Sequence, residues 1–239
     1  MTTQSAPVLV TRPQAEAFAD ALVSRFGARV RPVLTPLLCP RNLDPDLPQR
    51  DYAAVVFTST QAVEASRALW PRLPRLAWCV GRRTSQAAAA AGFDARSADG
   101  DARALVSALS AAPPSGRTLY LRGVDTSFNL LDELHNLGIS ADELIVYVQE
   151  SRPLSPKAIE LLQQPDAVIL PLFSPRTARL FRAALPSDCR ARLHIAAMSE
   201  TVAAALDDLP HAALAIARHP DAAAMLDVIE SLLADLALP

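Results

Sequence analysis

The residues of this sequence that are able to do chemistry gather where predicted strands end and helices begin. These turns hold hydroxyl groups, arginines and glycines: Thr11-Arg12-Pro13, Thr58-Ser59-Thr60, Gly81-Arg82-Arg83-Thr84, Arg122-Gly123, Phe173-Ser174-Pro175-Arg176 and Met198-Ser199-Glu200-Thr201. The start of a helix carries free backbone N–H groups and the positive end of the helix dipole, so it favours anions. Because ligands of open α/β sheets bind just beyond the carboxyl ends of the strands, these turns together predict a site for a polyanionic ligand.

One of these turns has a copy later in the chain. Residues 51–63 contain an aspartate, an apolar run and then Ser59 before a helical pattern, and residues 166–178 repeat this order with Ser174. Both serines stand at the N-cap position, where a side-chain oxygen accepts a bond from a backbone N–H group. Neither has the Gly-x-Ser-x-Gly frame or a histidine partner in the sequence, so we interpret them as helix caps rather than nucleophiles. The repeat predicts two similar lobes, each presenting one such turn.

The remaining chain alternates short apolar runs with helical patterns, which is typical of an α/β fold. Strands are predicted at residues 7–11, 28–32, 52–58, 76–80, 93–96, 118–121, 143–150, 167–172, 193–197 and 212–217. Helical patterns lie between most of them. Pro13 suits the first turn of the first helix, and Gly27 suits its C-cap.

Extended segments at residues 33–38 and 143–150 occupy matching places in the two halves of the sequence. The second is expected to end at Pro153 and Pro156. We therefore expect the chain to pass twice between the lobes. The predicted fold class is α/β, with two doubly wound parallel-sheet lobes and a ligand cleft between them.

Composition excludes several classes of protein. The chain has 239 residues, 51% of them hydrophobic, and a net charge of −2 without a basic block, so nucleic-acid binding is not expected. No signal peptide or membrane-spanning run is evident. The three cysteines follow no metal or disulfide spacing, and we interpret them as reduced thiols of a cytoplasmic protein. The four histidines show no metal-ligand spacing, and nucleotide-binding glycine motifs are missing.

In order along the chain, several short motifs resemble those of the uroporphyrinogen-III synthase family. They are Val10-Thr11-Arg12-Pro13, Val56-Phe57-Thr58-Ser59 with Ala62-Val63, Val80-Gly81-x-x-Thr84 with Gly92-Phe93, Leu119-Tyr120-Leu121-Arg122-Gly123, Val146-Tyr147 and Phe173-Ser174-Pro175. Each motif alone is short, but the ordered set covers nearly the whole chain. The sequence is therefore identified as similar to a divergent bacterial member of that family.

This resemblance implies an architecture and a reaction. Residues 1–34 and 151–239 would form one lobe and residues 48–142 the other, joined by a two-stranded antiparallel connector at 33–40 and 143–150. The family cyclises hydroxymethylbilane, a linear tetrapyrrole with eight carboxylates. Water leaves and the last pyrrole ring is inverted through a spiro intermediate to give uroporphyrinogen III. No cofactor or metal is used, and we expect a monomer.

The resemblance also implies site residues. Tyr147 corresponds to the family's tyrosine near the end of the connecting strand, where a phenol assists departure of the hydroxyl group; a packed strand aromatic is the alternative. The residues expected to bind substrate are Arg12, Thr58, Ser59, Thr60, Gly81, Arg82, Thr84, Arg122, Gly123, Ser174, Pro175, Arg176 and Ser199.

The sequence departs from the family pattern at one turn. The family usually has a second Gly-x-x-Thr there, with a functionally important threonine. In one register Ser199 replaces the glycine and Val202 the threonine, whereas in the other Met198 replaces the glycine and Thr201 keeps the place of the threonine. Thr201 is thus a catalytic candidate in only one of the two registers.

Two other functions fit the same features. A two-lobed binder or sensor of a polycarboxylate or tetrapyrrole would also hold an anion in a cleft without catalysis. A degenerate synthase would retain binding only. The predicted function is the cyclising lyase, and these two functions are its alternatives.

Overall fold

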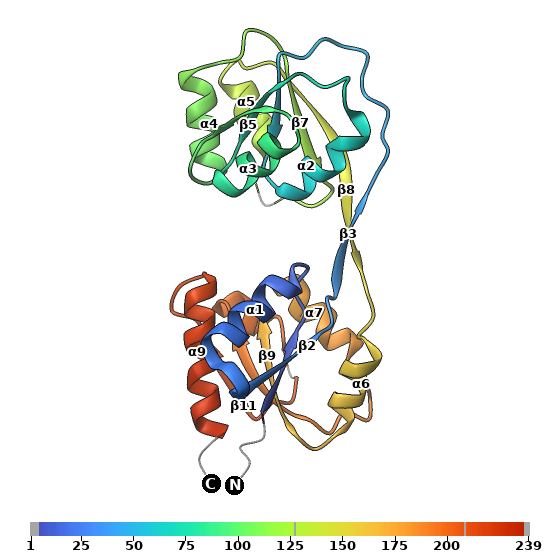
Figure 1. Ribbon diagram of the computed structural model, residues 1–239, viewed down its shortest axis with the longest axis vertical. Coiled ribbons are helices and arrows are strands. Elements are labelled where there is room, and N and C mark those ends of the chain that lie inside the picture. The colour runs from blue at the N-terminus through green and yellow to red at the C-terminus, as the bar shows by residue number, and fades with distance from the viewer. Residues whose placement is uncertain (1–4, 127, 208, 237–239) are drawn as a thin grey trace. The chain divides into compact units, whose positions relative to one another are not determined.

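The computed structural model describes residues 5–126, 128–207 and 209–236, and the chain divides into two compact units (Figure 1). Unit 1 comprises Met1–Cys39 and Ser151–Pro239, and unit 2 comprises Pro40–Glu150. The chain therefore leaves unit 1 and returns to it. In the described part of the chain, no helix is long and apolar enough to cross a membrane.

Unit 1 is built on a parallel sheet. Its strands lie in the order β11-β10-β9-β1-β2, and each neighbouring pair is parallel. The strands are β1 (Ala6–Val10), β2 (Val30–Leu34), β9 (Ala167–Leu172), β10 (Arg192–Ala197) and β11 (Ala213–Ile216). Central strands such as β9 are buried on both faces, which explains their continuous apolar sequence.

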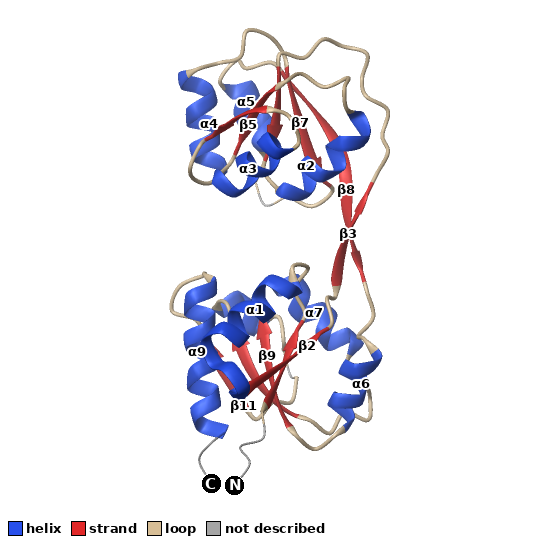
Figure 2. Ribbon diagram, in the orientation of Figure 1, coloured by secondary structure: helices blue, strands red, loops and turns tan. Residues whose placement is uncertain are grey.

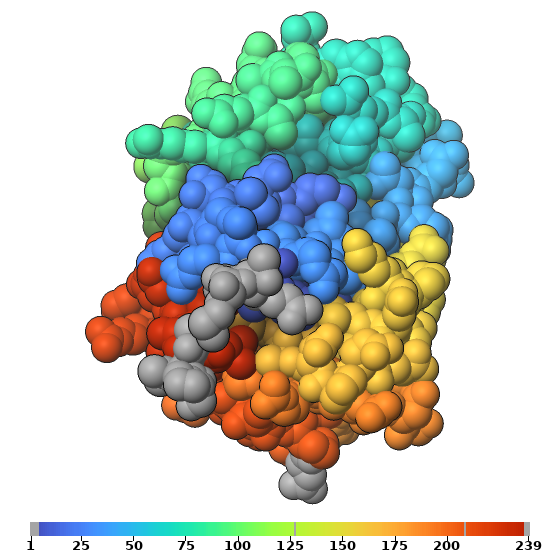
Figure 3. All heavy atoms as spheres, turned by 60° about the horizontal axis from the view of Figure 1, so that its bottom comes forward, coloured from blue at the N-terminus to red at the C-terminus, as the bar shows by residue number. Residues whose placement is uncertain are grey.

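Helices cover both faces of this sheet (Figures 1 and 2). One face packs against α1 (Ala15–Phe26) and α9 (Ala222–Leu236) around Phe18, Leu22 and Ile229. The other packs against α6 (Pro156–Gln163), α7 (Pro175–Ala184) and α8 (Glu200–Ala204). In Figure 3 the early part of the chain, in blue, lies between the yellow segment that contains α6 and the red segment that contains α9.

Unit 2 has a sheet of the order β3-β8-β7-β4-β5-β6. Its strands are β3 (Leu38–Asn42), β4 (Ala54–Phe57), β5 (Leu76–Cys79), β6 (Asp94–Ser97), β7 (Thr118–Gly123) and β8 (Ala141–Ser151). The pairs from β8 to β6 are parallel. Helices α2 (Thr60–Ser66) and α3 (Arg82–Ala90) cover one face, and α4 (Ala102–Ala111) and α5 (Leu130–Asn136) cover the other. Short 3-10 turns follow α1 at Gly27–Arg29 and α2 at Arg67–Leu69.

The edge strand β3 runs antiparallel to β8. The Leu43 N–H donates to the Val146 carbonyl over 2.8 Å, and the Arg152 N–H donates to the Leu37 carbonyl over 2.9 Å. The residue numbers of the first segment therefore increase while those of the facing segment decrease, as in an antiparallel pair. The sheet of unit 2 is therefore mixed. The predicted α/β class with two parallel-sheet lobes and an antiparallel connecting pair is confirmed.

Three local predictions were wrong. The first connecting strand is β3 at Leu38–Asn42 rather than residues 33–38, because β2 continues to Leu34 in the sheet of unit 1 and Thr35 bonds back to Val10. Pro13 precedes helix α1, which begins at Ala15. Pro156 begins helix α6 instead of merely ending a strand, because Ser155 caps this helix and proline fits its first position.

Candidate functional site

The two predicted serine caps are present with nearly the same geometry. Ser59 has φ −150° and ψ 152°, and its Oγ accepts the Ala62 N–H over 3.1 Å. Ser174 has φ −151° and ψ 151°, and its Oγ accepts the Thr177 N–H, also over 3.1 Å. These bonds satisfy backbone donors at the starts of α2 and α7. The prediction that both serines cap helices is confirmed in each unit.

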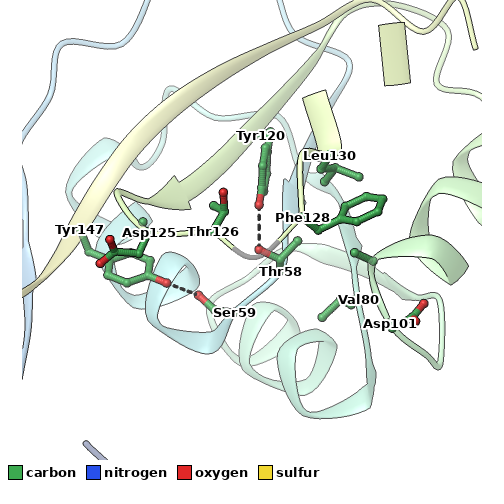
Figure 4. Close-up of a pocket in the computed structure, with 12 residues that line it drawn as sticks. Thr58, Ser59, Val80, Asp101, Tyr120, Asp125, Thr126, Phe128, Leu130 and Tyr147 are labelled. Atoms are coloured by element: carbon green, nitrogen blue, oxygen red, sulfur yellow. Dashed lines mark hydrogen bonds between the residues drawn. The ribbon is translucent and has the colours of Figure 1, made fainter. Parts of the chain in front are cut away.

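In unit 2 the Ser59 turn meets Tyr147 (Figure 4). The Tyr147 hydroxyl lies 3.2 Å from Ser59 Oγ. Its ring lies against Gly123: a Cβ atom added there would be 2.6 Å from Tyr147 Cζ and 2.9 Å from its hydroxyl oxygen. The register between β7 and β8 shifts between Arg122 and Gly123, so that Gly123 is opposite Tyr147. Only a residue without a side chain leaves this ring in place.

A second phenol reaches the same turn. Tyr120 on β7 is 3% exposed, and its hydroxyl lies 3.0 Å from Thr58 Oγ1. Burial raises the pKa of Tyr120, so its phenol stays protonated at neutral pH. The consecutive hydroxyls of Thr58 and Ser59 are thus each paired with one tyrosine (Figure 4).

These hydroxyl pairs border a pocket of about 380 Å³ at the carboxyl ends of the parallel strands. It is lined by Thr58, Ser59, Val80, Asp101, Ala102, Tyr120, Gly123, Asp125, Thr126, Phe128, Leu130 and Tyr147. None of these described lining residues is a lysine or arginine. Asp101 accepts the backbone N–H groups of Ala104 and Arg103 at the start of α4, and these bonds lower its pKa and keep it ionised. The pocket therefore favours N–H donors or positive charge over carboxylates.

Arg122 is held by its own neighbours. Its guanidinium makes two 2.8 Å bonds to the carboxylate of Glu143, and it donates to the carbonyls of Gly123 and Val124 over 2.9 and 3.1 Å. The bond to Glu143 raises the pKa of Arg122, and the same bond lowers the pKa of Glu143. We therefore assign Arg122 to fixing the loop after β7 and no longer expect it to bind substrate.

This ion pair predicts a pH-dependent contribution to stability. The folded pKa of Glu143 is depressed, so the pair stabilises the fold above the unfolded value near 4.5 and is lost as pH falls through the folded value. We expect Glu143→Gln to lower the free energy of unfolding by about 1 kcal/mol at pH 7, after discounting for solvent screening. In urea unfolding, the loss should shrink as the pH falls below the unfolded value near 4.5 and through the depressed folded value.

The exposed ion pair of Glu64 and Arg67 supplies the control for this measurement. Glu64→Gln should change stability by no more than about 0.5 kcal/mol at either pH. A Glu143→Gln penalty that is as large at pH 3 as at pH 7 would contradict the assignment.

In unit 1 the pairing of β1 with β9 brings together two predicted turns. The Arg12 guanidinium carbon lies 4.5 Å from the ring centre of Phe173, the residue before Ser174. Phe173 packs edge-on against Phe18, with ring centres 4.9 Å apart. Arg12 is thus stacked on an aromatic face at the start of α7, near Pro175 and Arg176, which begin that helix.

Comparison with known proteins decides the family. The family model described as "Uroporphyrinogen-III synthase HemD" matches residues 17–227. The chain belongs to the uroporphyrinogen-III synthase family. The predicted resemblance is confirmed, and with it the assignment to a family of cyclising lyases that act on a linear tetrapyrrole.

Solved structures of uroporphyrinogen-III synthases match this chain, and the first of the two described here shares its fold. The enzyme from Helicobacter pylori is 18% identical with a TM-score of 0.65, and the match covers 95% of this chain and 99% of that one. A mutant enzyme from Thermus thermophilus is also 18% identical, with a TM-score of 0.47 over 97% of this chain and 99% of that one. A comparison with curated proteins finds no match.

The structure decides between the two registers at the departure from the family's Gly-x-x-Thr pattern. Ser199 precedes α8 with φ −162° and ψ 167°, as Gly81 precedes α3 with φ −157° and ψ 175°. Val202 therefore occupies the position of Thr84, and both are buried. Thr201 is exposed one position earlier and bonds to Ser199 Oγ over 2.9 Å. Thr201 is thus not at the position of unit 1 that corresponds to Thr84 of unit 2.

Of the predicted site residues in unit 2, only Thr58, Ser59, Gly123 and Tyr147 line the pocket. Thr60 is the first residue of α2 and is not among the residues that line the pocket. The remaining predicted residues at the start of α3 do not line it: Gly81 precedes that helix, the exposed Arg82 pairs with Asp99 over 3.2 Å, and Thr84 is buried.

Sequence reasoning missed several residues of the pocket. Tyr120 gave one usable signal, because a buried tyrosine inside a mostly buried strand needs a partner for its hydroxyl group. Asp101, Asp125, Thr126 and Phe128 lie on the turns after β6 and β7, where the sequence has no motif that marks them.

Proposed function

We propose that the pocket of unit 2 holds the hydroxymethyl-bearing end of hydroxymethylbilane while this uroporphyrinogen-III synthase closes the ring. The observation that carries the proposal is the Tyr147 phenol at the pocket, 3.2 Å from Ser59 Oγ. A pyrrole ring is apolar on its faces and donates one N–H bond at its edge. Val80, Phe128 and Leu130 suit its faces, and the carboxylates of Asp101 and Asp125 suit its N–H group and the positive charge that follows water loss.

Tyr147 acts in this proposal as the general acid. Its O–H proton passes to the hydroxymethyl oxygen as the C–O bond breaks, and the electron pair of that bond leaves with the water molecule. The pyrrole nitrogen shares its electrons with the carbon that loses the bond. Ser59 donates its O–H to the phenolate oxygen that forms, which stabilises the charge where it develops.

Ring closure returns the protein to its starting state. The substituted carbon of the last ring attacks the electron-deficient carbon to form the spiro intermediate, and rearrangement inverts that ring. The proton released when the macrocycle regains its aromatic pyrroles goes back to the Tyr147 phenolate. Tyr147 therefore gives one proton and takes one back in each turnover. The rest of the protein contributes by positioning the substrate.

The carboxylates of the substrate need other partners. Helix α3 begins at Arg82 after Gly81, which has no side chain to cap it, so its start suits a carboxylate. In unit 1, the start of α7 at Pro175 and Arg176 and the stacked Arg12 provide a similar environment. Helix α8 after Ser199 also begins without a side-chain cap. We assign side-chain carboxylates of the bilane held in unit 2 to the start of α3.

The proposal includes the expectations that the enzyme works as a cytoplasmic monomer without a cofactor. The expectation of no cofactor rests on the family reaction, which needs no redox change, and the expected location rests on the free thiols of Cys39, Cys79 and Cys189 among the described residues.

Product analysis tests the function. Purified protein given fresh hydroxymethylbilane should yield uroporphyrinogen III in large excess over isomer I, faster than the bilane closes in buffer. Isomer resolution by chromatography after oxidation to the porphyrins measures this ratio. The protein should need no added metal or cofactor.

A non-catalytic tetrapyrrole binder is the second candidate. It would bind the bilane or the product while isomer I forms at the spontaneous rate. Formation of isomer I alone in the presence of saturating protein would therefore contradict the synthase function and favour the non-catalytic binder.

A further inference from the structure

The second tyrosine of the pocket has no part in the mechanism above. Tyr120 is an internal residue of β7, opposite Val56 on β4, whereas Thr58 lies two residues farther along. Two strand residues span about 6.6 Å, which is about the reach of a tyrosine from its Cα to its hydroxyl oxygen. The ring therefore runs along the sheet inside the core and delivers only its hydroxyl to the pocket edge (Figure 4).

The aromatic ring itself is anchored by packing. Tyr120 belongs to the apolar cluster between the sheet and helices α4 and α5, with Val56, Trp78 and Leu105. Its relative exposure is 3%, so the ring cannot swing out to bind substrate without unpacking that core. The hydroxyl oxygen is consequently a fixed point, 3.0 Å from Thr58 Oγ1.

Either hydroxyl can donate in the bond between Tyr120 and Thr58, and the acidity of the phenol favours one direction. A phenol is a stronger acid than an aliphatic alcohol, so the better-matched arrangement has Tyr120 donating and Thr58 accepting. Burial raises the pKa of Tyr120, so the donor proton is kept. The hydroxyl hydrogen of Thr58 is then left to point away from Tyr120, toward the pocket that both residues line.

We propose that Tyr120 is a positioning residue for the cyclisation, because its buried phenol orients the Thr58 hydroxyl as a hydrogen-bond donor to the bound bilane. This inference rests on the proposed function of the pocket. Thr58 touches substrate, and Tyr120 acts through it. Tyr147 and Tyr120 thereby have separate tasks: one transfers a proton, and the other fixes how the substrate lies.

The test compares Tyr120→Phe, Thr58→Val and the double variant with wild type. Phenylalanine retains the buried ring, and valine retains the branched shape of threonine, so each change removes only a hydroxyl. Enzyme is used in excess over hydroxymethylbilane, so closure in solution is negligible and the isomers report closure on the protein. We expect Tyr120→Phe to lower the single-turnover rate about tenfold and to raise the share of isomer I.

The double variant separates positioning from independent effects. If Tyr120 acts through Thr58, the double variant should be no slower than Thr58→Val alone. The inference would be overturned if the rate losses of the two single variants multiplied in the double variant. It would also be overturned if Tyr120→Phe kept a rate and an isomer ratio within about twofold of wild type. Excess isomer III from wild type in the same assay keeps this outcome distinct from failure of the proposed function.

Tyr52 supplies a matched control. Its hydroxyl also bonds a polar side chain in unit 2, Asp142 over 2.9 Å, but the residue does not line the pocket. Tyr52→Phe should leave the rate and the isomer ratio unchanged. Equal losses of rate in Tyr52→Phe and Tyr120→Phe would show a general effect on folding. That result would also overturn the assignment of Tyr120 as a positioning residue.

Discussion

Tyr147→Phe is expected to lower kcat about a hundredfold while changing the affinity for uroporphyrinogen III only a few-fold. Loss of a general acid costs ~10²–10⁴ in rate, and the lower end applies because the pyrrole nitrogen assists departure of the hydroxyl. The phenylalanine ring can still pack against Gly123, so the fold and the pocket are retained. Single-turnover rates and product titration measure the two quantities separately.

Ser59→Ala provides the companion measurement. Ser59 both caps α2 and bonds the Tyr147 hydroxyl, so this change should lower stability by about 1 kcal/mol and kcat by about tenfold. Ser174→Ala removes the equivalent cap in unit 1, where the Ser174 Oγ contacts the Thr177 N–H and hydroxyl, and should show the stability loss with a smaller loss of rate. A Tyr147→Phe variant that turns over within threefold of wild type would exclude Tyr147 as the acid.

The fold was largely predictable because its strongest signals are local. Buried parallel strands read as continuous apolar runs, as at Ala54–Phe57 and Ala167–Leu172, and serine caps mark the helices that follow. Edge and connecting segments were less predictable. The sequence of β3, Leu38–Asn42, carries a proline and polar residues because it has a neighbour on one side only, so its composition resembles a loop.

The site was only partly predictable, since its residues come from turns that meet through sheet order. The alignment of β4 between β7 and β5 places the Thr58 turn beside the ends of both strands, and no sequence spacing states that order. The charge of a turn was also misleading. Arg122 lies at the predicted turn, but its guanidinium forms an ion pair with Glu143 on the neighbouring strand. An arginine seen in the sequence therefore need not offer its charge to a ligand.

Gly123→Ala is expected to abolish most activity at a modest cost in stability. The new Cβ would lie 2.6–2.9 Å from three atoms of the Tyr147 side chain, two in the ring and the hydroxyl oxygen, which is closer than such atoms approach. The strand backbone is held in the sheet, so the ring must move, and its hydroxyl then leaves Ser59 and the pocket. We expect kcat to fall about a hundredfold, as for loss of a general acid, and the free energy of unfolding to fall by about 1–2 kcal/mol.

A double variant that combines Gly123→Ala with Tyr147→Phe shows whether Gly123 acts through Tyr147. If displacement of the phenol is the cause, Gly123→Ala with Tyr147→Phe should be no slower than either single variant, because the hydroxyl is already lost from its place. Gly116→Ala is the control in the same unit, since its Cβ would meet only Ala53, at 3.2 Å and away from the pocket. Full activity in Gly123→Ala would mean that the phenol reaches its proton acceptor from another position, and the geometry assigned to Tyr147 would then be wrong.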